Sequence, residues 1–479
     1  AGRIATSTTP TGVTGYSYAP GTGQQAGISA PGRVAHAFAY DGALLVKEVI
    51  SGPVAGTISQ TYDNDLEVTS VAVNGQAVSF AYDQDGLLTQ AGELTLSRRA
   101  DNGLISGSAL GATSTTQTYN GFGELASVQA DVGGTPVYSA TYSRDKLGRI
   151  TARSETIQGV TTVRTYGYDL AGRLQDVSVN GEPSARYEYD ENGNRTRIVG
   201  FGTIPSVEAS YDAQDRLTRF GGATYSYTAN GELSSRNVGA ETTRYDYDVL
   251  GNLRQVTLPD RTTIEYLIDG SNRRIGKKVN GVLVQGFVYE SQLRPAVELD
   301  GAGNVVARFV YGTRPNVPEY MVKGGETYRF IHDHLGSPRL VVNVASGEIS
   351  QRMDFDEWGF VALDSNPGFQ PFGFAGGVDD RDTKLIRFGA RDYDAHAGRW
   401  TAKDPILFDG GSMNLFAYVN GDPINRVDHA GKDDPIGLNA CLKACKPLKP
   451  NYEECQDACW KKHQPPPEKE PAPQPKKCK

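Results

Sequence analysis

Most of the chain alternates aromatic or apolar positions with polar or small ones at a period of two. In the segments 164–168, 185–189 and 243–247, tyrosines stand at every second position near the end of the segment. Alternation at this period is typical of β-strands that bury one face. Each of these segments ends at a Tyr-Asp pair, and after a short turn an Arg/Asn/Glu-Leu/Ile pair usually begins the next one. The pattern predicts a long series of β-hairpins.

The Tyr-Asp signature recurs along the first 300 residues. The tyrosine of each copy stands at position 40, 62, 82, 119, 142, 168, 189, 211, 227, 247, 266 or 289. The steps run from 16 to 26 residues, apart from one of 37 that contains a degenerate copy at 99–103. Self-similarity in this range is typical of repeat proteins, in which each unit is too small to bury a face alone. We therefore predict a repeat architecture.

The turn after each Tyr-Asp pair has the form Asp-x-x-Gly, as in 169–172, 190–193 and 248–251. The aspartate can accept hydrogen bonds from backbone amides two residues on, and the glycine supplies the positive φ of a short hairpin loop. Asp215 stands at one glycine position, and aspartate tolerates that conformation comparatively well. The alternative interpretation is a row of catalytic carboxylates. Because the spacing to the glycine is fixed, we predict that the repeat aspartates are structural.

Composition and charge narrow the classes of function. Glycine accounts for 56 of the 479 residues without a period of three, which fits many tight turns. The formal net charge is −8 and no basic stripe crosses the repeats, so we expect no nucleic-acid partner. No apolar run approaches the roughly 20 residues of a membrane helix, and the first residues given do not have the pattern of a signal peptide. Residues 1–4 resemble the end of a repeat turn such as 171–174, so we expect the C-terminal part of a longer protein.

From about residue 320 the repeats give way to denser, individual motifs. Asp-His-Leu-Gly-Ser-Pro-Arg lies at 333–339, Phe-Asp-x-Trp-Gly at 355–359, and Arg-x-Tyr-Asp, Gly-Arg-Trp and Asp-Pro follow within 391–405. In order and spacing these motifs, together with the repeats, resemble the RHS/YD-repeat family and its RHS repeat-associated core domain. The resemblance implies an all-β fold in which a spiralling sheet of β-hairpins forms a hollow shell (a YD-shell), with the core domain as a plug. In the family such shells enclose a variable C-terminal segment, often a toxin.

The chain divides into four predicted parts. Residues 1–319 are the repeats of the shell wall, and 320–432 are the core domain with a possible self-cleavage region. Residues 433–460 carry paired cysteines, and 461–479 form a Pro/Lys-rich tail with six prolines and a net charge of +4. A tail of this composition is expected to be disordered.

Asp404 and Asp428 are the candidate catalytic residues. The resemblance implies an aspartyl-type self-cleavage that needs two aspartates in Asp-Pro motifs about twenty residues apart. The first motif matches Asp404 and the second matches Asp428, which places scission after Lys432. Two carboxylates held close together share a proton, so that one acts as an acid and the other as a base. The structural alternative makes both aspartates turn residues.

The chain departs from that family pattern at several positions. Leu407 stands where a glycine is usual, His429 replaces a proline, and Lys432 replaces the leucine before the cut. Residues 434–438, Asp-Pro-Ile-Gly-Leu, match the last half of the pattern better, so a displaced cut after Leu438 is the alternative. We expect no enzymatic activity beyond self-cleavage. The alternative interpretation is a core domain that is inactive.

His332 and His334 flank Asp333, and such an arrangement on a strand suggests a metal site. The sequence offers no third or fourth ligand at a telling distance. We predict packed or turn-binding roles for both histidines, and neither a metal nor a cofactor in this part of the chain.

All five cysteines lie near the C-terminus, between 441 and 478. Two Cys-x3-Cys pairs place their members on one helix face each, which predicts a small α-helical hairpin stapled by two disulfides in an oxidising compartment. The alternative is a zinc site, because four cysteines suffice for one. The fifth cysteine, Cys478, is left over and available for an intermolecular bond. The four paired cysteines are Cys441, Cys445, Cys455 and Cys459.

Three hypotheses for function follow. The first is a secreted or surface-displayed bacterial shell that encloses or presents its own C-terminal segment as cargo, with upstream parts of the same polypeptide or a secretion machinery as partners. The second is a toxin precursor that cleaves itself and frees a small effector. The third, based on the animal teneurins that share the shell, is an extracellular adhesion or recognition module.

Overall fold

The computed structural model describes residues 2–432 of the chain. These residues form 39 β-strands and four short 3-10 helices, with no α-helix among them. Each of the first 34 strands pairs antiparallel with the next one in the sequence, so a single continuous sheet runs from β1 (Thr6–Thr9) to β35 (Val361–Asp364). The observed sheet confirms the predicted series of β-hairpins.

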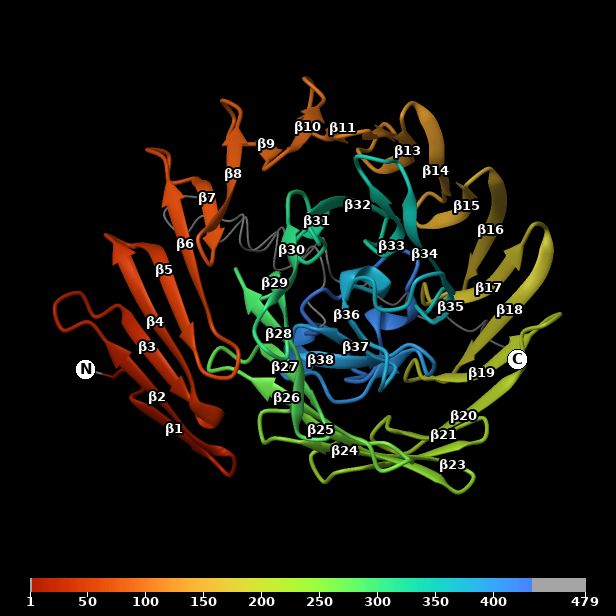
Figure 1. Cartoon of the computed structure of the whole chain (residues 1–479). Helices are drawn as coiled ribbons and strands as arrows, with labels where there is room; N and C mark the ends of the chain where they lie inside the picture. The colour runs from red at the N-terminus through yellow and green to blue at the C-terminus, as the bar shows by residue number, and fades with distance from the viewer. Residues whose placement is uncertain (1, 433–479) are drawn as a thin grey trace, which may run out of the picture.

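The sheet has an outer arc, a base and an inner coil (Figure 1). The outer arc consists of β1, β2 (Gly12–Tyr18), β3 (Gln25–Ala30), β4 (Val34–Asp41), β5 (Leu44–Ser51), β6 (Gly56–Tyr62), β7 (Val68–Val73), β8 (Gln76–Tyr82), β9 (Leu88–Ala91), β10 (Leu94–Arg98), β11 (Ile105–Leu110), β12 (Thr113–Tyr119), β13 (Leu125–Val132), β14 (Thr135–Arg144), β15 (Ile150–Ile157), β16 (Val160–Tyr168), β17 (Leu174–Val179), β18 (Glu182–Tyr189) and β19 (Arg195–Gly200), with the 3-10 helix η1 (Pro31–Arg33). The base consists of β20 (Val207–Tyr211), β21 (Leu217–Phe220), β22 (Ala223–Tyr227), β23 (Leu233–Val238), β24 (Glu241–Tyr247), β25 (Leu253–Thr257) and β26 (Thr263–Ile268). The inner coil consists of β27 (Arg274–Val279), β28 (Val282–Tyr289), β29 (Pro295–Asp300), β30 (Val305–Val310), β31 (Tyr320–Lys323), β32 (Glu326–His332), β33 (Pro338–Asn343), β34 (Ile349–Phe355) and β35.

The inner coil packs against the inner face of the outer arc, which makes the sheet a spiral of more than one turn (Figure 1). Three buried clusters join the two layers. One contains Val34 and Phe287, a second contains Leu94 and Val310, and a third joins Tyr138 with several residues of β32 and β33. Burying these faces against each other is the main stabilising contribution for repeats that cannot fold alone. The predicted all-β spiral of a YD-shell is confirmed.

One repeat unit shows why the Tyr-Asp signature is needed. Asp169 accepts hydrogen bonds at Oδ1 from the amide of Arg173 (2.9 Å) and at Oδ2 from its Nε (2.6 Å), while Gly172 has φ = 84°. The Arg173 guanidinium then lies 4.6 Å from the ring centroid of Tyr189, the tyrosine of the next repeat. The Tyr189 hydroxyl donates to the carbonyl oxygen of Leu174 at 2.6 Å. Each signature therefore closes its own turn and binds the following hairpin.

The same arrangement recurs along the sheet. Arginine–tyrosine stacking at one repeat step joins Arg3 to Tyr18, Arg149 to Tyr168, Arg216 to Tyr227, Arg273 to Tyr289 and Arg294 to Tyr311. Cation–π contacts of this kind contribute about 0.5–1 kcal/mol at exposed sites. The prediction that the repeat aspartates serve the turns is confirmed, because their carboxylates bind backbone amides and neighbouring arginines.

Asp215 fills the glycine position of one turn with φ = 60°. Its carboxylate accepts hydrogen bonds from the side chains of Asn192 (2.9 Å) and Asn194 (2.7 Å) in the preceding turn. Aspartate at this position thus adds a contact between repeats that glycine could not make.

Removal of the Tyr189 hydroxyl is expected to destabilise the protein by about 1 kcal/mol, because the carbonyl of Leu174 loses its donor. Tyr166 is the matched control, since its buried hydroxyl has no hydrogen-bond partner among the described residues. Tyr189→Phe should lower the thermal midpoint, whereas Tyr166→Phe should leave it unchanged or raise it. Equal losses in the two variants, measured by scanning calorimetry, would contradict the role given to the tyrosine hydroxyl.

The last described segment forms a cap on the hairpin ends. It contains η2 (Phe374–Gly376), a second sheet of β36 (Val378–Asp380), β37 (Leu385–Phe388), β38 (Arg391–Asp394) and β39 (Arg399–Trp400), and the helices η3 (Leu407–Gly410) and η4 (Val419–Gly421). Its centre is an aromatic cluster of Phe388, Tyr393, Trp400 and Tyr418. We call residues 372–432 the cap.

The cap contacts several Tyr-Asp repeats of the sheet. Asn425 donates to the Tyr168 hydroxyl at 2.9 Å, Arg399 Nη2 donates to the carbonyl of Asp215 at 2.6 Å, and the Tyr247 hydroxyl donates to Thr401 at 3.0 Å. These contacts hold the cap in one position on the spiral. The division predicted at residue 320 stays a prediction, because the sheet itself runs on without a break through β35.

The predicted helical hairpin at 433–460, its candidate disulfides and the tail at 461–479 lie outside the described residues. Among residues 2–432, no helix has the length and hydropathy required to cross a membrane.

Candidate active site

Arg391 brings the two candidate carboxylates together. It lies in β38 with a side chain that is 1% exposed, and its Nη2 is 2.8 Å from Asp404 Oδ2 and 2.9 Å from Asp428 Oδ2. The face of its guanidinium lies 4.2 Å from the ring centroid of Trp400. Asp404 and Asp428 are themselves almost fully buried. The predicted pair of aspartates is therefore assembled around one cation, 24 residues apart in sequence.

The chain around Asp404 forms a closed loop. The backbone amide of Asp404 donates to the carbonyl of Leu415 at 3.0 Å, and Arg391 Nη1 donates to the same carbonyl at 3.2 Å. Asp404 Oδ1 accepts from the amide of Ile406 at 2.9 Å, the i+2 bond that the repeat aspartates also make. Asp404 is thus a turn residue as well as a member of the pair.

Asp428 holds the backbone of Lys432. Its Oδ1 accepts from the Lys432 amide at 3.0 Å, while Arg391 Nε donates to the carbonyl of Gly431 at 2.7 Å. Gly431 has φ = 62°, and a Cβ there would lie 2.2 Å from the carbonyl oxygen of Phe388. The backbone nitrogen of Lys432 is two covalent bonds from the carbonyl carbon of the same residue. Because Asp428 binds that nitrogen, its carboxylate lies close to the predicted scissile carbonyl. Asp433, across that bond, lies outside the described residues.

The environment of the pair raises the pKa of one of its two carboxyl groups. Burial raises the pKa of Asp404, and the charge of Asp428 raises it further, against the opposing effect of Arg391. The ammonium of Lys432 also lowers the pKa of Asp404, which puts that charge near the pair. A carboxyl group whose pKa is raised beside a second carboxylate is the arrangement that acid–base catalysis by two aspartates requires.

Comparison with known proteins decides the family. The family model described as teneurin YD-shell matches residues 1–423. This chain belongs to the teneurin YD-shell family. Teneurin-3 of Danio rerio is 29% identical over 409 residues, which cover 82% of this chain and 15% of that protein. Toxin protein Tse5 of Pseudomonas aeruginosa is 29% identical over 366 residues, which cover 66% of this chain and 27% of that protein.

Solved structures have the same fold. The crystal structure of TcdB2-TccC3-Cdc42 matches with a TM-score of 0.60 at 16% identity, covering 91% of this YD-shell chain and 24% of that chain. The structure of TcdB2-TccC3-TEV matches with a TM-score of 0.59 at 16% identity, over 90% of this chain and 24% of that one. The chain spans only about a seventh of the teneurins and about a quarter of Tse5.

Leu407 stands where the family pattern usually has a glycine, and its backbone adopts a conformation typical of glycine. The residue has φ = 53°, the left-handed conformation that glycine adopts without strain. The backbone of this YD-shell thus keeps the conformation of a glycine although a leucine fills the position.

Leu407→Gly is expected to stabilise the cap by about 1 kcal/mol, because a leucine in the left-handed region costs about 1–2 kcal/mol and glycine loses part of that gain through its greater freedom when unfolded. Leu170 is the matched control, an exposed turn leucine whose φ is not positive. Leu170→Gly should be neutral or destabilising. Thermal unfolding of both variants checks this, and a loss of stability in Leu407→Gly would contradict the assignment.

The two histidines of the core motif are packed, as predicted. His334 Nε2 donates to the carbonyl oxygen of Ile424 at 2.8 Å, and burial lowers its pKa to about 4. His332 stacks on Phe330, and burial lowers its pKa to about 3. Within residues 2–432, no group of three or more His, Cys, Asp and Glu side chains has the geometry to hold a metal ion. His334 instead connects the inner coil of the YD-shell to the cap.

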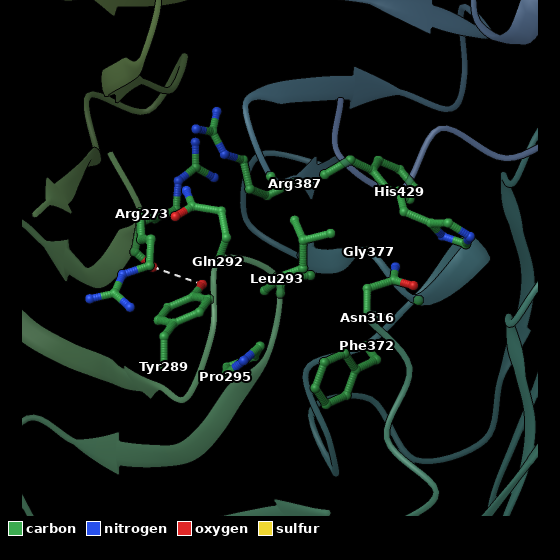
Figure 2. Close-up of a pocket in the computed structure, with 15 residues that line it drawn as sticks. Arg273, Tyr289, Gln292, Leu293, Pro295, Asn316, Phe372, Gly377, Arg387 and His429 are labelled. Carbon is green, nitrogen blue, oxygen red and sulfur yellow. Dashed lines mark hydrogen bonds between the residues drawn. The ribbon is translucent and has the colours of Figure 1, made fainter. Parts of the chain in front are cut away.

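A small cavity is lined by residues of the inner coil and of the cap (Figure 2). It has a volume of about 30 Å³, enough for a water molecule or two, and its lining includes Arg273, Arg387, Asn316 and His429. His429 is largely buried, and burial lowers its pKa to about 4, so that it is neutral at physiological pH. The histidine that replaces the family's proline therefore forms part of a cavity wall.

Arg391 is the residue of the candidate site that sequence reasoning missed. It stands 13 residues before Asp404 and 37 before Asp428. The Arg-x-Tyr-Asp motif that contains it could be recognised in the sequence, but the motif does not indicate that the arginine contacts the two aspartates. One signal could have indicated it. An arginine within a motif rich in aromatic residues is expected to be buried, and a buried cation requires anionic partners.

Proposed function

We propose that this YD-shell chain is self-processing: it presents its own C-terminal segment at the cap and hydrolyses the peptide bond after Lys432. The observation that carries the proposal is Arg391, which gathers Asp404 and Asp428 at the backbone of Lys432.

Hydrolysis of that bond adds the oxygen of one water molecule to the Lys432 carbonyl carbon, breaks the C–N bond and transfers a proton to the leaving amine. Asp404, whose pKa is raised, supplies the proton as general acid. Asp428 accepts the proton of the attacking water. Arg391 holds the two carboxyl groups in register and compensates the negative charge that develops at the carbonyl oxygen.

The spiral serves this chemistry as a scaffold. Contacts of the cap with several Tyr-Asp repeats fix the carboxylate pair against a rigid wall, as catalytic geometry requires. The segment after Lys432 is the cargo, and the similarity to Toxin protein Tse5 supports an effector role for it. We place the protein outside the cell or on its surface. A cut after Leu438 is the alternative position.

The heavy-oxygen content of the product tests the hydrolysis. In water enriched in oxygen-18, the body fragment should carry one heavy oxygen atom in the new carboxylate of Lys432, and the released segment should carry none. The rate should fall as pH rises through the raised pKa of Asp404, because the acid form is required. A body fragment without heavy oxygen, or a rate that rises steadily with pH, would contradict this mechanism.

A further inference from the structure

The loop from Asp404 to Leu415 presents an apolar surface. The loop is closed at its neck by the hydrogen bond between the Asp404 amide and the Leu415 carbonyl. Beyond the neck, the side chains of Leu407, Phe408 and Met413 are 50%, 59% and 83% exposed. Three large apolar side chains are exposed within seven residues of one loop, a concentration unlike the scattered single residues that are common on protein surfaces. We call these three residues the loop patch.

The loop patch begins where the described chain ends. Asp404, at the neck, shares Arg391 with Asp428, and Asp428 binds the amide of Lys432. The charge of Lys432 is close enough to Asp404 to lower its pKa. The segment that follows Lys432 therefore starts beside the base of this loop.

The first residues of that segment have a suitable composition. Asp433 and Asp434 are followed by Pro435, Ile436, Gly437 and Leu438. At about 3.3 Å per extended residue, Ile436 and Leu438 lie within roughly 13–20 Å of Lys432 along the chain. The loop of twelve residues is closed at Asp404 and Leu415, so its tip lies at most about six extended residues, roughly 20 Å, from that neck.

We propose that Ile436 and Leu438 of this same chain dock on the loop patch. A tethered segment has an effective concentration in the millimolar range, so a small apolar contact is enough to hold it. A second copy of the protein is a poorer fit, because stable association buries about 800 Å² on each partner, and three side chains offer far less. Docking fixes the chain on both sides of the 432–433 bond and retains the segment at the cap after a cut.

Hydrogen exchange of the amides at 436–440 tests the docking. It is measured on the full chain and on the full chain with Asp404→Asn, which keeps the segment attached if the protein cleaves itself. Protection is expected in both. Phe408→Ser combined with Met413→Ser should speed this exchange about tenfold or more, corresponding to about 1.4 kcal/mol.

Phe122 supplies the matched control. It is 92% exposed on a distant repeat turn, and Phe122→Ser should leave the exchange at 436–440 unchanged. Exchange in β38 should also be unchanged in every variant, which shows that the cap stays folded. Conversely, Ile436→Ser with Leu438→Ser should speed exchange of the loop amides at 407–413.

The remaining outcomes overturn the proposal. Absence of protection at 436–440 means that the segment is not docked, and protection that survives the loop variants means that it docks elsewhere. Loop protection that depends on protein concentration identifies a second copy as the occupant, and protection that requires added phospholipid vesicles identifies a membrane. Because the readout does not depend on scission, an uncut chain with a docked segment would refute only the proposed self-cleavage.

Discussion

Arg391→Met is expected to destabilise the cap by about 3–5 kcal/mol, because it leaves two buried carboxyl groups without their cation. Methionine keeps much of the aliphatic length and the contact with Trp400, so the loss reports mainly on charge. The free energy of opening is measured by native-state hydrogen exchange of the amides in β37 to β39. This choice avoids the assumption that a spiral of many repeats unfolds in one step.

Two controls isolate the effect of the buried charges. Adding Asp404→Asn and Asp428→Asn to Arg391→Met removes the uncompensated carboxylates and should recover most of the loss. Arg426→Met removes a cation that is 58% exposed and 3.9 Å from Asp422, for which a cost of about 0–1 kcal/mol is expected. A cost for Arg391→Met as small as that for Arg426→Met would show that Arg391 does not hold the pair together.

Asp404→Asn and Asp428→Asn are each expected to slow self-cleavage at least about 100-fold, since a positioned acid or base contributes about 10²–10⁴ in rate. Asparagine keeps an acceptor for the Ile406 amide in one case and for the Lys432 amide in the other, so the turns should persist. The first-order appearance of the 1–432 fragment, followed by mass spectrometry at fixed pH, gives the rates.

Asp422→Asn is the matched control for these two variants. Asp422 is a buried carboxyl group of the same cap, and its Oδ1 accepts hydrogen bonds from the backbone and side chain of Asn425 rather than from residues of the pair. Burial raises the pKa of Asp422 as it does that of Asp404. A rate that falls equally in Asp422→Asn would indicate a general effect on the cap and contradict a specific role for the pair.

The repeat architecture could be predicted because its chemistry is local. The bonds of Asp169 reach at most four residues along the chain, so spacing alone reveals them. The stacking of Arg173 on Tyr189 links adjacent repeats and was not predicted, although both residues belong to the signature. The packing of β28 inside β4 and β5 depends on the curvature accumulated over many strands, which no local pattern contains.

The candidate site was predicted only in part, for a similar reason. The resemblance supplied Asp404 and Asp428, but their partner Arg391 comes from a strand of the second sheet, and no spacing pattern links it to either aspartate. The conformation of Leu407 was also beyond prediction, since a leucine gives no sign of a positive φ. Each of the two aspartates closes a turn while it contacts Arg391, which is the arrangement that the structural interpretation expects.

The intact mass of the purified full chain under denaturing conditions tests the central claim most directly. Self-processing at the Arg391-centred pair predicts a body that ends at Lys432 and a separate segment of 47 residues. A body that ends at Leu438 would mean that the protein cleaves itself at the alternative position. A single uncut mass after prolonged incubation at mildly acidic and neutral pH would contradict the claim and leave a shell whose carboxylate pair only holds the cap together.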